Sequence, residues 1–236
     1  MNGSVDPRYT RYEMFSRTPT VLALAASDVH VWRIALDGDG DHHVASLSAA
    51  ERARLERRRG RQRDRFAISH GAMRQLASRY LGSDAADVPM EARYGHQPRV
   101  EGLELSLTHC DDLALCAVAL GPVGVDVEAT ADADDDDLDL MAEATLAPAE
   151  LRIFRDAADE ERAHWWLRFW VRKEAVLKAR GLGLGDHALC ELDVSGERTG
   201  ELAIVDLDIG PGHVAALAVS PRTCRVTTGE WVDESR

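Results

Sequence analysis

Apolar residues recur at helical and strand spacings along this chain of 236 residues and divide it into alternating elements. Steps of three and four predict long helices over 65–81 and 160–180, and a glycine, Gly82 or Gly181, ends each of them. Shorter helices are predicted over 48–60, which begins with the N-cap residue Ser48, and over 147–156. Short apolar runs predict strands over 29–36, 103–107, 113–120, 123–128, 190–194, 202–209, 214–219 and 225–232, with a turn over 109–112. The pattern therefore predicts an α+β fold.

Two stretches of the chain resemble each other. The helix that begins Arg65-Phe66 and the one that contains Arg168-Phe169 share their spacing of apolar residues, and each precedes a hairpin whose second strand ends alike, at 115–118 and 216–219. The identities are few, so a duplication and a chance match both stay open. A duplication predicts two similar α+β halves related by a pseudo-twofold axis, with a ligand cleft between them. The halves would be 20–121 and 122–236, after a flexible N-terminal arm over 1–19.

Composition excludes several classes of protein. The hydrophobic fraction is 45%, and no apolar run approaches the roughly 20 residues that span a membrane. The N-terminus lacks a signal-peptide pattern, so a cytoplasmic protein is expected. The four cysteines have no CxxC spacing, which indicates reduced thiols and neither zinc nor a redox pair; they are Cys110, Cys116, Cys190 and Cys224.

Charge is unevenly distributed in this acidic chain, whose net charge is −13. Basic residues crowd one segment: Arg52, Arg54, Arg57, Arg58, Arg59, Arg61, Arg63 and Arg65. Acidic residues crowd another, at Asp132 and over 134–137. We therefore expect no general nucleic-acid binding, although the basic segment could hold one acidic ligand or partner.

Two short segments suggest a site for a metal ion and phosphate. In the strand over 123–128, Asp126 and Glu128 face the same way, because side chains two apart in a strand share a face. In the helix over 160–180, Trp170, Glu174 and Lys178 share a face at steps of four. Carboxylate oxygens are what Mg²⁺ prefers, with water and substrate phosphate completing its coordination. The three carboxylates and the lysine therefore predict a divalent-metal site that handles phosphate.

A plainer reading of the same residues stays open. The strand pair could face solvent on a sheet edge, and Glu174 with Lys178 could be a surface ion pair. Trp170 on the same face argues against that reading, because a large aromatic side chain usually marks a face that packs. For Arg172 and Lys173, a surface position is expected.

These segments resemble the signature of the 4'-phosphopantetheinyl transferases, in particular the single-chain surfactin-type group. The matching residues are Gly124-Val125-Asp126-Val127-Glu128 and the run from Trp170 to Leu184, and the likeness extends over about 48–219. The resemblance implies a holo-[acyl-carrier-protein] synthase with the two-halved fold of that family.

The resemblance also implies roles for single residues. Asp126, Glu128 and Glu174 would hold Mg²⁺, or Mn²⁺ in its place, against the coenzyme A pyrophosphate. Lys178 would lie near the reacting phosphate, Glu174 would act in catalysis as well as in metal binding, and Glu150 would be the general base. The residues implied at the nucleotide end of coenzyme A are Arg52, Arg54, Arg65, Thr108 and His109. Gln97 replaces a usual cation there, and Arg99 or His96 could compensate.

The implied activity transfers the 4'-phosphopantetheine group from coenzyme A to a serine of an apo acyl- or peptidyl-carrier protein, with release of 3',5'-ADP. The enzyme would be a monomer that serves secondary-metabolite biosynthesis, with no membrane or nucleic-acid partner. Two alternatives stay open. One is a Mg-dependent nuclease or nucleotidyl-transfer enzyme that uses the same carboxylates. The other is a non-catalytic homologue that binds a partner through its arginine-rich segment.

Overall fold

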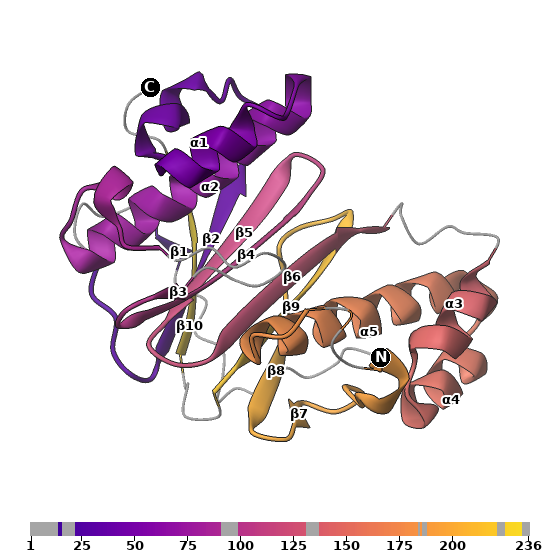
Figure 1. The fold of residues 1–236 in the computed structure, drawn as a ribbon. Coiled ribbons are helices and arrows are strands. Elements are labelled where there is room, and N and C mark those ends of the chain that lie inside the picture. Colours follow the sequence, from indigo (N-terminus) through magenta and orange to yellow (C-terminus); the bar gives the residue numbers. More distant parts are fainter. Residues whose placement is uncertain are drawn as a thin grey trace.

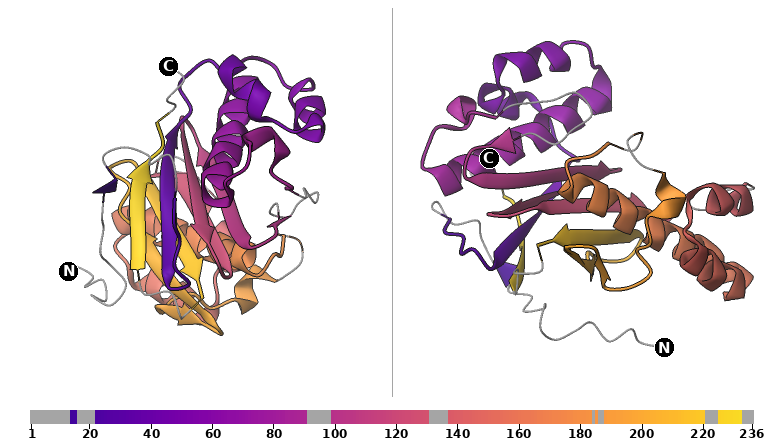
Figure 2. Two further views of the ribbon diagram at one scale, coloured as in Figure 1. Left: turned by 90° about the vertical axis from the view of Figure 1, so that its left-hand side faces the viewer. Right: turned by 60° about the horizontal axis from the view of Figure 1, so that its bottom comes forward.

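The structure is a computed structural model that describes residues 14–15, 22–90, 99–130, 137–183, 185, 188–220 and 225–232. Two sheets lie face to face, and a long helix covers the outer face of each (Figure 1). Figure 2 shows the same arrangement from two other sides, with α1 and α2 at one end of the molecule and α3 to α5 at the other. The helices are α1 (Ala49–Leu55), α2 (Gly60–Leu81), α3 (Leu138–Thr145), α4 (Pro148–Asp156) and α5 (Asp159–Ala179).

The first sheet has six strands in the order β1-β10-β2-β5-β4-β3. Their bounds are β1 Met14–Phe15, β10 Arg225–Glu230, β2 Asp28–Ala35, β5 Leu113–Ala119, β4 Leu103–Cys110 and β3 Arg99–Val100. The second sheet has four strands in the order β6-β9-β8-β7, which are Val123–Ala129, His213–Val219, Leu202–Leu207 and Arg198–Thr199. The C-terminal strand β10 lies in the first sheet, parallel to β2 and to β1.

The order of strands repeats between the two sheets. In each half a strand is followed by a long helix and then by three strands, and the last of these pairs antiparallel with the first: β2-β5-β4-β3 in one sheet and β6-β9-β8-β7 in the other. The predicted repeat of two similar α+β halves is therefore confirmed at the level of topology. The exact boundary between 121 and 122 stays a prediction.

One detail of the predicted repeat is wrong. Matching 115–118 with 216–219 aligns Leu115 with Ala216 in the two repeats. The Leu115 side chain, however, faces the core between the sheets, whereas the Ala216 side chain faces α5. A shift of one residue turns every side chain of a strand to the other face, so the true correspondence of β5 and β9 differs by one position. Alanine and valine suit both faces, which is why the wrong alignment looked acceptable.

Three other predictions need correction. The helix predicted over 48–60 ends at Leu55, and α2 begins at Gly60, whose positive φ of 53° turns the chain between them. The segment 190–194 forms no strand. Leu189–Glu191 is a 3-10 helix, and the Leu189 carbonyl accepts from the Lys173 side chain instead of from a neighbouring strand. Helix α3 was not predicted, because it follows directly on the acidic stretch that suggested a loop.

Three of the four apolar clusters among the described residues make up most of the core. Valine, alanine and leucine side chains from β2, β5, β6, β8 and β9 fill the space between the sheets. The side chains of α2 pack on the outer face of the first sheet, and those of α5 pack on the second. Within the described residues no helix is long and apolar enough to cross a membrane. The predicted N-terminal arm lies outside the described residues except for β1.

Candidate active site

Gly124 allows strand β6 to lie directly against helix α5. A Cβ atom at this position would come within 1.9 Å of the carbonyl oxygen of Ala175 and 2.6 Å of the amide nitrogen of Ala179, so only glycine fits. Alternation along the strand places Asp126 and Glu128 on the same face as Gly124, toward α5, while Val125 and its odd-numbered neighbours enter the core between the sheets. The close contact therefore brings the acidic face of β6 to the helix.

Asp126 is buried and is held by groups from both halves of the molecule. The Lys178 Nζ on α5 donates to Oδ1 of Asp126 over 2.6 Å, and it also donates to the carbonyl oxygen of Val125 over 3.2 Å. The hydroxyl of Thr108 on β4 donates to the same Oδ1 over 2.8 Å. The other oxygen, Oδ2, is buried and has no hydrogen-bond partner among the described residues. A buried carboxylate oxygen in that state is suited to accept a ligand.

Glu174 lies in the electrostatic field of the same group of charges. Burial is the largest cause that raises the pKa of Glu174, to about 7, and the negative charge of Asp126 is the next. The Lys178 ammonium opposes this rise in pKa, and Glu128 adds to it. A cation at this place would therefore relieve the repulsion among the three carboxylates.

The donor set fits a hard divalent cation, because it consists of carboxylate oxygens with one of them left buried and unbound. In the described part of the chain, however, no three His, Cys, Asp or Glu side chains lie close enough together to hold a metal ion as they stand. The carboxylates of Asp126 and Glu128 thus influence Glu174 electrostatically, but the three do not yet form a cluster of metal ligands. Binding would require Glu128 or Glu174 to turn toward Oδ2 of Asp126.

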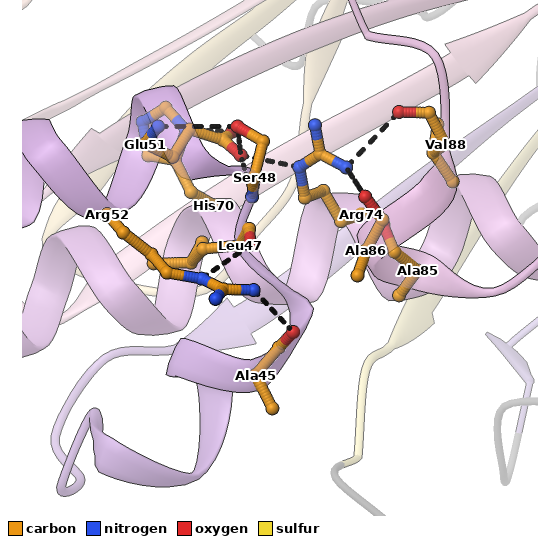
Figure 3. Close-up of polar contacts among 10 residues, drawn as sticks. All are labelled: Ala45, Leu47, Ser48, Glu51, Arg52, His70, Arg74, Ala85, Ala86 and Val88. Carbon is orange, nitrogen blue, oxygen red and sulfur yellow. Dashed lines mark hydrogen bonds and ion pairs between the residues drawn. The ribbon is translucent and has the colours of Figure 1, made fainter.

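In the other half, a buried network fixes the arginine-rich helix α1 (Figure 3). Ser48 caps the helix by accepting from the Glu51 amide, and the Glu51 carboxylate accepts from the Ser48 amide over 2.9 Å. Glu51 also accepts from Arg74 Nε on α2 over 2.5 Å and lies 3.3 Å from His70 Nδ1. Burial opposes ionisation of Glu51, but the hydrogen bonds from His70 and Ser48 and the charge of Arg74 outweigh it and lower the pKa of Glu51 to about 2.

Three predicted nucleotide-binding arginines lie on or near α1 and α2. Arg52 is exposed and donates to the carbonyl oxygens of Leu47 and Ala45, as Figure 3 shows. Arg54 is exposed too, and its guanidinium lies 5.3 Å from the centre of the Phe66 ring. Arg65 on α2 donates to Asp112, the last residue of the turn between β4 and β5. All three therefore remain near the surface of the N-terminal half.

Thr108 and His109 are neighbours in β4 that face opposite ways. Thr108 faces Asp126, whereas His109 is exposed on the face where Leu105 packs against α2. Strand β4 thus separates an acidic region at β6 and α5 from a basic region at α1 and α2. The structure brings Thr108, Asp126 and Lys178 together in direct contact, and it leaves His109 on the side of Arg65.

Comparison with known proteins identifies the family. The sequence model of the 4'-phosphopantetheinyl transferase superfamily matches residues 122–221. The chain is also 30% identical over 219 residues to the 4'-phosphopantetheinyl transferase HetI of Nostoc sp. strain PCC 7120, a match that covers 86% of this chain and 92% of HetI. The chain belongs to the 4'-phosphopantetheinyl transferase superfamily.

Among solved structures, the holo-[acyl-carrier-protein] synthase of Thermotoga maritima is similar over 42% of this chain and 62% of its own, with 21% identity and a TM-score of 0.33. Membership of the superfamily confirms the predicted transferase class and removes support from the nuclease alternative. The surfactin-type subgroup stays a prediction.

Glu150, the predicted general base, lies in a buried ion pair. Its side chain is fully buried, and its two oxygens accept from the amides of Val194 and Ala147. It also forms an ion pair of 2.7 Å with Lys173, which is itself fully buried and donates to the carbonyl oxygens of Leu189 and Leu192. This position gives Glu150 a structural role that joins α4, α5 and the segment after it.

The predicted surface positions of Arg172 and Lys173 are wrong. Arg172 is 4% exposed and shares the carboxylate of Asp206 with Arg168. The sequence showed two cations in a motif but not the carboxylates that pair with them, because those lie far away in the chain. His96 and Gln97 lie outside the described residues, as does the acidic run except for Asp137, which precedes α3. Arg99 begins β3, and its side chain lies outside the described part.

Proposed function

We propose that this protein transfers the 4'-phosphopantetheine group of coenzyme A to a serine of an acyl- or peptidyl-carrier protein and releases 3',5'-ADP. The observation that carries the proposal is the contact of Lys178 with the buried Asp126 where β6 lies on α5, with Glu174 in the electrostatic field of both. Membership of the superfamily supports the reaction class. HetI carries the name of a 4'-phosphopantetheinyl transferase, which supports transfer of the same group by this chain.

In the proposed reaction the serine oxygen attacks the β-phosphorus of coenzyme A. A new phosphorus–oxygen bond forms, the bond to the bridging oxygen of the pyrophosphate breaks, and 3',5'-ADP leaves. The protein supplies no covalent intermediate, so its contribution is positioning and stabilisation of charge. This agrees with a site that consists of carboxylates and a lysine and has no activated nucleophile.

Mg²⁺ or Mn²⁺ would be held by Asp126, Glu128 and Glu174, and when bound it would neutralise charge on the pyrophosphate. Lys178 supplies a second positive charge at the same place, since its ammonium already lies beside Asp126. Glu150 is too deeply buried in its ion pair to take the serine proton. The carboxylates on the accessible side are Glu128 and Glu174, which are both partly exposed.

The basic region of the N-terminal half is proposed to receive the nucleotide end of coenzyme A. Arg54 and Arg65 present guanidinium groups, which recognise phosphate well, and His109 is exposed on the same side. The outward position of these groups contrasts with the burial of Arg74 and Arg172, which serve the fold. One ligand could therefore span the two halves, with its phosphates between them.

The test is to incubate the protein with coenzyme A, Mg²⁺ and several purified apo carrier proteins and to weigh each carrier by mass spectrometry. We expect a mass gain equal to one phosphopantetheine group on at least one carrier. If no carrier of the acyl or peptidyl type gains this mass, the proposed activity is wrong.

A further inference from the structure

The two oxygens of Asp126 are unequally occupied. Oδ1 accepts two hydrogen bonds, from Lys178 over 2.6 Å and from Thr108 over 2.8 Å. Oδ2 is equally buried and has no hydrogen-bond partner among the described residues. A carboxylate that is fastened through one oxygen has a fixed direction for the other. Metal ligands are commonly oriented in this way, by a hydrogen bond from a residue that does not itself touch the metal ion.

Thr108 lies in the N-terminal half, opposite the half that carries Asp126, and its own sheet holds it in place. It is 8% exposed and pairs with Leu115 in the middle of the first sheet. Two residues earlier on the same face of β4, the Ser106 hydroxyl accepts a hydrogen bond of 2.9 Å from the Val125 amide of β6. This contact sets the distance between β4 and β6 just beside Asp126. The Thr108 hydroxyl therefore has little freedom to choose another partner.

Lys178 alone would hold Asp126 less firmly. Its side chain is 21% exposed and ends a flexible chain of four methylene groups, whereas threonine has one rotatable bond before its hydroxyl. The lysine also divides its donors between Asp126 and the carbonyl oxygen of Val125. A short, buried donor on a strand is the better device for orientation.

We infer that Thr108 is a positioning residue for the metal site: its hydroxyl holds Oδ1 of Asp126 so that Oδ2 is presented to the divalent cation. The inference rests on the proposed function for the presence of the cation. It differs from the role that the family resemblance implied for Thr108, which was a contact with the nucleotide end of coenzyme A. In this structure the Thr108 hydroxyl donates to the acidic region, and the basic region is left to His109 and the arginines.

The two roles predict different results for T108V, which removes the hydroxyl and keeps the shape of the side chain. The full-length protein is titrated with Mg²⁺ by calorimetry and with Mn²⁺ by electron paramagnetic resonance, in the presence and absence of coenzyme A. We expect T108V to bind either ion about tenfold more weakly, the lower part of the range for outer-shell ligand partners, because Lys178 still holds Oδ1. T108S keeps the donor, so its affinity should lie within about twofold of wild type, a much smaller loss than the one expected for T108V.

Ser106 provides the matched control. S106A removes a buried hydroxyl from the same face of β4 and loses the contact with the Val125 amide, but it removes no hydrogen bond that the structure gives to Asp126. It should lower stability without changing the affinity for either ion. If T108V does not fold, T108C replaces it, because a thiol of similar size is only a weak donor.

Each outcome decides between the roles. Unchanged metal affinity in T108V with a raised KM for coenzyme A would assign Thr108 to the nucleotide instead. Unchanged metal affinity and unchanged KM would leave it a purely structural hydrogen bond. If wild type itself binds neither ion, both the inference and the metal site of the proposed function are wrong. If wild type modifies carriers but T108V binds the metal ion with normal affinity, only the inference about Thr108 is wrong.

Discussion

The backbone of Gly124 touches the backbone of α5 at Ala175, so closely that a Cβ atom on Gly124 would lie 1.9 Å from the Ala175 carbonyl oxygen. The first position of the acidic strand motif is thus explained by packing and not by a direct part in the chemistry. It fixes the separation between the strand that carries Asp126 and the helix that carries Glu174 and Lys178. The site and the fold are joined at this contact.

Substitution G124A should therefore damage both stability and the site. The added methyl group meets helix backbone, which cannot swing aside, so we expect a loss of about 3 kcal/mol or more in the free energy of unfolding. Urea unfolding measures this loss. The control is G121A, three residues earlier, where the nearest atom that a Cβ would meet among the described residues is the Ser220 Cβ at 3.8 Å. Equal stability of the two variants would contradict the close contact.

The buried pair Glu150–Lys173 should be far more important for stability than for chemistry. K173M leaves the Glu150 carboxylate buried without its cation, which should cost about 3–5 kcal/mol in urea unfolding. The double variant E150Q/K173M should recover part of that loss, because neither charge then remains unpaired. For E150Q, kcat per folded molecule should stay within a few-fold of wild type. A fall of about a hundredfold or more would restore Glu150 as the general base.

Glu51 should make the N-terminal half sensitive to acid. Its pKa in the folded protein is lowered to about 2 from an ordinary value of 4.5, so the folded state favours the ionised form. The resulting stability is present above about pH 4.5 and is lost as the pH falls toward 2, by up to about 3 kcal/mol. Urea unfolding of wild type and E51Q across this range tests the sign. E51Q should be less stable at neutral pH and should show a smaller fall in stability between pH 4.5 and 2.

Arg65 and Arg61 allow a matched test of the proposed nucleotide end. Both donate to Asp112, but Arg61 is much more exposed. R65A should raise the KM for coenzyme A about tenfold, in line with the loss of one charged hydrogen bond. Its KM for dephospho-coenzyme A should change less. R61A, which removes the other arginine that binds Asp112, should leave both KM values near those of wild type. If R61A and R65A behave alike, the arginines act only through Asp112.

The sequence alone predicted much of this fold for physical reasons. The long helices ended at Gly82 and close to Gly181, because glycine adopts the left-handed conformation that ends a helix, with φ of 67° and 69°. Asp126 and Glu128 were correctly placed on one face, since a strand alternates without exception over so short a run. Each of these features depends only on residues that are close together in the chain.

What the sequence could not predict depends on contacts between distant residues. The segment 190–194 has the alternation of a strand, yet its Leu192 carbonyl accepts from Lys173 and its Val194 amide donates to Glu150. The burial of Lys173 and Arg172 depends on Glu150 and Asp206, which no spacing rule connects to them. Likewise, nothing in the sequence indicates that Thr108 reaches Asp126 across the boundary between the halves. Only the packing of the two sheets shows this.

The most direct measurement is the rate of carrier modification, followed by mass spectrometry with coenzyme A and an apo carrier, for wild type and the double variant D126A/E174A at several Mg²⁺ concentrations. The predicted result is a phosphopantetheine mass gain with wild type that requires Mg²⁺ and is abolished in the folded double variant. Modification that persists in the double variant at a rate close to that of wild type would contradict the assignment of the site at β6 and α5.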